Sequence, residues 1–125
     1  MTKEDEGALQ QLQWAIQALA ANEADQPALF PDFVCVCCEL INDFGNWYHA
    51  TIWRESLVFT ERQRQSLESL NKRIDVLEHT VCFSNSILEK EDWCELRTSA
   101  SECLSMFGWQ RNPPPINRSV YIKGE

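Results

Sequence analysis

The sequence predicts an all-α protein: a single-domain bundle of four to five helices followed by an extended, Pro-rich C-terminal tail. The 125 residues match the usual size of one domain. Residues that break helices are scarce, with four Gly and five Pro, and three of the prolines fall together at 113–115. Apolar residues recur with the helical period over long segments. We therefore assign residues 1–111 to the bundle and 112–125 to a tail that packs on the same domain or on a partner.

The first helix is expected over Asp5–Asn22, where acidic residues at its start favour the positive end of the helix dipole. Residues 23–31, which contain Pro27 and Pro31, are expected to form a loop. The apolar face of the first helix would consist of Leu9, Leu12, Ile16, Leu19 and Ala20, with Trp14 beside it.

A second helix is expected to open at Pro31-Asp32 and to run to Phe44, because Pro costs little at a first helical position. Gly45 would cap or kink it, and a further helical segment would follow over residues 46–59. The helical wheel separates an apolar side from an acidic side. The apolar side holds Phe33, Cys37, Leu40, Ile41 and Phe44, and the acidic side holds Asp32, Glu39 and Asp43.

The clearest helical pattern covers Thr60–Val81. Thr60 and Gln63 have the spacing of a capping box, which marks the start of the helix. One narrow apolar stripe follows, with charged residues between its members, and it predicts an outer helix of the bundle that serves as scaffold. The stripe consists of Leu67, Leu70, Ile74, Leu77 and Val81.

The last helix is expected to begin at a second capping box, Ser86 with Glu89, and to end at Phe107 before Gly108. Its buried face would include Trp93, Leu96, Ala100, Cys103, Leu104 and Phe107. The alternation of apolar and polar residues over 116–122 is typical of a strand, which would need an edge or a groove to lie against.

The charge of the chain argues against a nucleic-acid partner. The net charge is −8, and residues 1–60 carry nine acids against two bases. Nucleic-acid binding depends on Lys and Arg that neutralise phosphates, whereas this field suits a basic protein partner or simply solubility. No stretch approaches the roughly 18 apolar residues of a membrane span, and the acidic N-terminus differs from a secretory signal. We expect a cytoplasmic protein.

The six cysteines are expected to be free thiols, mostly buried, because a cytoplasmic chain with this apolar content needs no disulfides. Structural zinc needs four ligands, and Cys35 with Cys38 supplies at most two. Cys35 lies near a helix N-terminus, which makes it the thiol to test for reactivity.

No catalytic set is visible, and we expect neither an enzyme nor a cofactor. P-loop, dinucleotide and G-x-S-x-G patterns are missing from the sequence. Glu39 and Asp43 are four residues apart, as in helical metal-dependent hydrolases, so a small Mg²⁺- or Mn²⁺-dependent hydrolase is the alternative. His49, in an aromatic run, and His79, four residues after Asp75, are interpreted as packing and surface residues.

The sequence therefore predicts a small acidic interaction protein that binds a basic protein partner, in a role like that of an immunity protein, antitoxin or inhibitor. Acidic residues would steer association, and an aromatic residue would then be buried in the partner. Of the five tryptophans, Trp47 and Trp109 are expected to be the exposed pair, since each lies next to a Gly at an element end. A second alternative is a homodimer in which the apolar stripe packs on its twin and the tail strand exchanges between subunits. The predicted binding residues are Asp32, Glu39, Asp43, Glu55 and Trp47.

Overall fold

The computed structural model describes residues 2–22, 24–31, 34–80 and 90–111. These residues form five helices and no strands, which confirms the predicted all-α class. The tail at 112–125, the apolar Phe33 and Val81, and the capping box at Ser86 lie outside the described residues.

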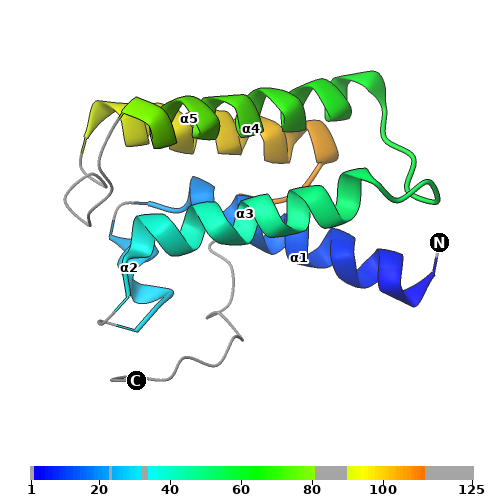
Figure 1. The fold of residues 1–125 in the computed structure, drawn as a ribbon, viewed down its shortest axis with the longest axis horizontal. Coiled ribbons are helices and arrows are strands. Elements are labelled where there is room, and N and C mark those ends of the chain that lie inside the picture. Colours follow the sequence, from blue (N-terminus) through cyan, green and yellow to red (C-terminus); the bar gives the residue numbers. More distant parts are fainter. Residues whose placement is uncertain (1, 23, 32–33, 81–89, 112–125) are drawn as a thin grey trace.

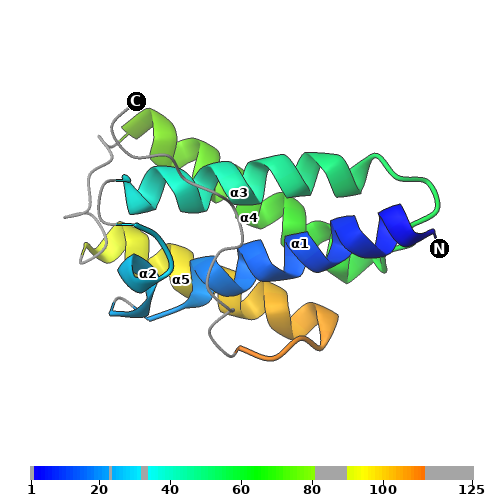
Figure 2. The same ribbon diagram turned by 90° about the horizontal axis from the view of Figure 1, so that it is seen from below.

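Four long helices run alternately up and down and pack as a bundle (Figure 1). Helix α1 packs against α3 and α5, α4 packs against α5, and a smaller contact joins α3 to α4. The start of α1 and the connection between α3 and α4 lie at one end of the bundle, and the short α2 lies at the other, as Figure 2 also shows. The core between the helices is apolar, and its largest fully buried side chains are Trp93 and Phe44.

Helix α1 spans Lys3–Ala20, two residues ahead of the expected range at each end. Thr2 caps it: the Asp5 amide donates to Thr2 Oγ1 at 3.1 Å, and the Thr2 amide donates to the Asp5 carboxylate at 3.2 Å. This reciprocal capping box satisfies two backbone donors that would otherwise lack a partner.

The expectation of a plain loop over residues 23–31 is wrong at Asp25–Ala28, which form the short helix α2. The amides of Asp25 and Gln26 both donate to the carbonyl of Asn22, at 2.9 and 3.0 Å. Pro27 fits here because the amides of a first helical turn have no intrahelical acceptor, so a missing N–H costs nothing.

Gly45 does not cap the helix, which was one of its two expected roles, because α3 is one helix from Val36 to Ile52. Gly inside a helix costs only about 1 kcal/mol. Phe44 and Tyr48 on either side of it are buried and stack with ring centroids 5.5 Å apart, so core packing holds the helix through the glycine. The helix starts later than Pro31-Asp32, with Cys35 as its N-cap, and ends before the expected Phe59.

Helix α4 spans Glu61–Thr80, and its capping box is present as predicted. The Gln63 amide donates to Thr60 Oγ1 at 3.1 Å, and the Thr60 amide donates to Gln63 Oε1 at 2.9 Å. The four described members of the apolar stripe are all buried and face the bundle of the same chain. The stripe therefore packs within its own chain, and the tail strand, whose exchange between subunits was the other part of the homodimer alternative, lies outside the described residues.

Helix α5 spans Glu91–Phe107 and ends as predicted at Gly108, whose φ of 69° is left-handed and suits glycine. The Gly108 and Trp109 amides donate to the Ser105 and Leu104 carbonyls at 3.1 and 3.0 Å, which closes the end of the helix.

A buried polar network centred on Gln26 joins α1, α2 and α5. The Gln26 side chain is 0% exposed, and its amide nitrogen donates to the carbonyls of Ala18 and Leu19, both at 3.1 Å. Its oxygen accepts from Trp93 Nε1 at 3.2 Å and from Arg97 Nε and Nη2 at 3.0 and 2.8 Å. The network satisfies the orphan carbonyls at the end of α1 and fixes α2 against α5.

Candidate functional site

Two of the most exposed apolar side chains in the described residues lie in the α3–α4 connection, which we define as residues 53–60. Trp53 is 80% exposed and Val58 is 90% exposed. Val76 on α4 and Met106 on α5 follow, at 56% and 43%. Single exposed apolar residues are ordinary on protein surfaces, but a Trp that is 80% exposed is not, because Trp is among the most buried residues on average.

The connection is fastened to the start of α1 by the carboxylate of Asp5. Arg54 forms an ion pair with Asp5 at 2.9 Å, and the Ser56 hydroxyl donates to the other oxygen of the same carboxylate. Arg54 also donates through Nε to the Ala50 carbonyl at 3.0 Å, and the Leu57 side chain is buried. These contacts fix the backbone of the connection, which carries the side chains of Trp53 and Val58.

Asp5 itself is 2% exposed, which is unusual for a carboxylate. The hydrogen bond from Ser56, followed by those from Thr2 and Arg54, holds the pKa of Asp5 well below its ordinary value. The carboxylate therefore stays charged at all physiological pH values and keeps its three partners in place.

The connection carries one exposed carboxylate, and two more flank Asp5 in the sequence. Glu55 lies between Trp53 and Val58 in the sequence and is exposed. Glu4 and Glu6 are exposed on both sides of Asp5, the residue that binds the connection. A shallow groove of about 450 Å³ runs beside the connection, with Trp53, Glu55, Val58 and Arg64 in its lining. The connection thus combines an exposed apolar anchor with the exposed carboxylate of Glu55, and Arg64 lines the same groove.

The other predicted acidic residues lie at the far end of α3. Glu39 and Asp43 are one turn apart near its start, and Asp32 lies outside the described residues. Because a helix rises about 1.5 Å per residue, Glu39 lies about 20 Å from the end of α3 that leads to Glu55. The structure therefore brings Glu39 and Asp43 together but keeps both apart from Glu55.

Glu39 and Asp43 are partly buried, not fully solvated as the helical wheel suggested. Burial, together with the nearby charge of Glu39, raises the pKa of Asp43 to about 6. The fully exposed positions along this side of α3 are Asn42, Asn46, His49 and Ala50.

The expected pair of exposed tryptophans is wrong. Trp47 and Trp109 are only partly exposed and pack against the core. Trp109 stacks on Phe107 with ring centroids 4.3 Å apart, and Phe107 in turn contacts Phe59 edge-on. Trp53, which the helical pattern placed inside a longer helix, is the exposed one because α3 ends just before it.

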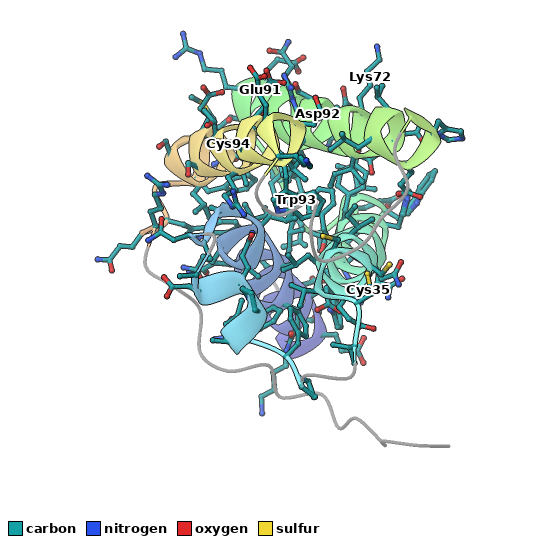
Figure 3. All side chains as sticks on the ribbon, turned by 90° about the vertical axis from the view of Figure 1, so that its left-hand side faces the viewer. Cys35, Lys72, Glu91, Asp92, Trp93 and Cys94 are labelled. Carbon is teal, nitrogen blue, oxygen red and sulfur yellow. The ribbon has the colours of Figure 1, made fainter. Side chains whose placement is uncertain are left out.

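The five described cysteines, Cys35, Cys37, Cys38, Cys94 and Cys103, are free thiols, as predicted, and Cys82 lies outside the described residues. Burial is less general than expected, since only Cys37 and Cys103 are buried. Burial raises the pKa of Cys37 to about 12 and also raises that of Cys103. Figure 3 shows Cys94 on the outer side of α5, while its neighbour Trp93 points into the bundle.

Among the residues that the structure describes, no three His, Cys, Asp or Glu side chains come together in a way that could hold a metal ion. Glu39 and Asp43 thus remain a pair. The two histidines are exposed: His49 contacts Tyr48 edge-on at 5.3 Å, and His79 forms the predicted pair with Asp75 at 3.7 Å. Across the described residues, no helix combines the length and the apolar character needed to span a membrane.

Comparison of this chain with protein-family models, with curated proteins and with solved structures found no match.

Proposed function

We propose that this protein is a non-catalytic interaction module that binds a basic protein partner through the α3–α4 connection. The observation that carries the proposal is the exposure of Trp53, at 80%, on a connection that Asp5 fastens to α1. The role is of the kind played by small acidic immunity proteins, antitoxins or inhibitors. Free thiols at all five described cysteines fit a reducing, cytoplasmic location.

The anchoring of the connection favours tight binding because it lowers the entropic cost of association. A flexible loop must be ordered when it binds, at about 0.5–1.5 kcal/mol for each immobilised side chain. Here Arg54, Ser56 and Leu57 already hold the backbone on both sides of Glu55. Trp53 can then bury roughly 150–250 Å² in a partner, the kind of contact that dominates binding energy in many interfaces.

The net charge of the chain, −8, favours a basic partner. Next to Trp53, Glu55 is exposed and Arg54 is already paired with Asp5, while Arg64 lines the same groove. Charges interact over about 8 Å at physiological ionic strength, so Glu55, which lines the same groove as Trp53, acts on a partner docked there. Glu39 and Asp43 lie about 20 Å and about 14 Å from the end of α3 that leads to the connection, so they contribute mainly to the overall field.

The test is a comparison of proteins retained by the immobilised full-length chain and by two variants. The wild-type chain should retain at least one protein of basic pI at low salt and release it at high salt. Trp53→Ala should lose that protein, and Val76→Ala should keep it, because Val76 is an exposed apolar residue away from the connection. For a partner so identified, Trp53→Ala should raise Kd by about 30-fold, the effect of losing a hot spot of about 2 kcal/mol. Retention of the same proteins by Trp53→Ala and wild type would refute the proposed surface.

A further inference from the structure

The start of α3 carries two partly exposed cysteines three residues apart. Cys35 is the N-cap of the helix, and Cys38 lies in its first turn. Figure 3 shows Cys35 at the end of α3, on the outside of the bundle. Cys37, between the two, is 0% exposed and belongs to the core. The Cys38 thiol is hydrogen-bonded to the sulfur of Cys35, so the two side chains are in contact.

This placement suits an intramolecular disulfide. Residues three apart at a helix start have Cβ atoms about 5–6 Å apart, and a disulfide needs about 3.5–4.5 Å. The backbone of Cys35 is extended, with φ −78° and ψ 108°, so it lies outside the regular helix. The remaining distance can therefore close through the N-cap residue, with the hydrogen-bonded turns of α3 left intact.

The surroundings give the two thiols different roles. Cys35 stands at the N-cap of α3 and is partly exposed, so its sulfur can be reached by an oxidant from solution. The hydrogen bond to Cys35, burial and the charge of Glu39 raise the pKa of Cys38 to about 11, so Cys38 is held as a thiol beside Cys35. Cys37 is too deeply buried to compete.

We propose that Cys35 and Cys38 form a reversible redox pair that exchanges with low-molecular-weight disulfides such as glutathione disulfide. The Cys35 thiol loses its proton, and its sulfur attacks one sulfur of the oxidant, whose disulfide bond breaks and releases the first glutathione as a thiolate that takes up that proton. Cys38 then loses its proton and attacks Cys35 Sγ, which breaks the mixed disulfide and releases the second glutathione. The protein loses two electrons and two protons, and one glutathione disulfide becomes two glutathione molecules. This inference does not depend on the proposed function.

The experiment uses the full chain with Cys82→Ser and Cys94→Ser. The protein is incubated with glutathione disulfide and quenched with acid, and its intact mass is measured by mass spectrometry. The expected product has lost two hydrogen atoms, carries no glutathione, and shows a Cys35–Cys38 link after proteolysis. Reduced glutathione in excess should restore the original mass. A product without the Cys35–Cys38 link would overturn the proposal. So would an unchanged protein mass at concentrations of glutathione disulfide that modify ordinary free thiols.

Two single substitutions in the same background test the assigned roles. Cys38→Ser should accumulate a mixed disulfide with glutathione on Cys35, because the resolving thiol is gone. Cys35→Ser should react at least tenfold more slowly at Cys38 under the same conditions, a difference of about 1.4 kcal/mol in barrier. Serine is a good N-cap residue at position 35, and Cys38 is only partly buried, so both variants should fold. Equal reaction of the two variants would contradict the roles. A chain that keeps Cys94, which is exposed near the start of α5, provides the control for exposure alone and should stop at a mixed disulfide there.

Discussion

Replacing Gln26 by Ala should destabilise the protein far more than a substitution in an ordinary surface loop would. The side chain makes five hydrogen bonds in a fully buried site, to Ala18, Leu19, Trp93 and Arg97. Leaving a buried polar group without a partner costs about 1–3 kcal/mol. The substitution removes the hydrogen bonds of Gln26 to the end of α1, to Trp93 and to Arg97 at the same time. A water molecule can occupy part of the space and recover some of this loss. We expect a loss of about 3–5 kcal/mol in the free energy of unfolding, out of the roughly 5–15 kcal/mol typical of a domain.

The assay is urea denaturation followed by tryptophan fluorescence, with Gln10→Ala as the control. Gln10 is exposed on α1, so its loss should change the free energy of unfolding by less than about 0.5 kcal/mol. A double-mutant cycle with Trp93→Phe, which removes the 3.2 Å hydrogen bond to Gln26, should give a coupling energy of about 0.5–1.5 kcal/mol. A loss below about 1 kcal/mol for Gln26→Ala, or no coupling to Trp93, would refute the structural role given to this network.

Three further predictions concern backbone and charge. Gly45→Ala should stabilise the protein by about 0.5–1 kcal/mol, because nothing lies within 4 Å of the added Cβ in the middle of a helix. Gly108→Ala should destabilise it by about 1 kcal/mol, because φ at this position is 69°. Thermal denaturation measures both, and shifts of the same sign would contradict the assigned conformations. Asp5→Asn should cost stability at pH 7, and the difference from wild type should shrink only as pH falls below about 4, because the folded pKa of Asp5 is lowered. Urea titrations at several pH values test this, and a difference independent of pH would count against it. The pKa of Asp43 is shifted in the opposite direction, upward to about 6, so Asp43→Asn should stabilise the fold above pH 6 and lose this advantage toward pH 4. A stabilisation that stays constant with pH in the same titrations would show that the charge of Asp43 is not responsible.

The helices were predictable where local signals and core packing agree. The capping box at Thr60 and Gln63 and the stripe that begins at Leu67 define α4, and Gly108 ends α5 in the left-handed conformation that its position indicated. At Gly45 the local signal failed because the energy that a glycine costs in a helix is small beside the burial of its aromatic neighbours.

The polar interior was missed because its partners come from distant parts of the chain. Gln26 lies in a segment with the composition of a loop, and nothing local marks it as buried. Arg97 gave a weak signal, since it falls on the same helical face as Trp93 and Ala100. Thr2 and Asp5 have capping-box spacing, but the ion pair of Asp5 with Arg54 spans 49 residues. Periodicity also placed Trp53 within a helix, so its exposure could be known only from where α3 ends.

The most direct test of the proposed function is the dissociation constant of a basic partner retained at low salt, measured for wild type, Trp53→Ala and Val76→Ala. The account predicts a Kd about 30-fold higher for Trp53→Ala and a change below about threefold for Val76→Ala. Equal affinity of Trp53→Ala and wild type would contradict the assignment of the α3–α4 connection as the binding surface.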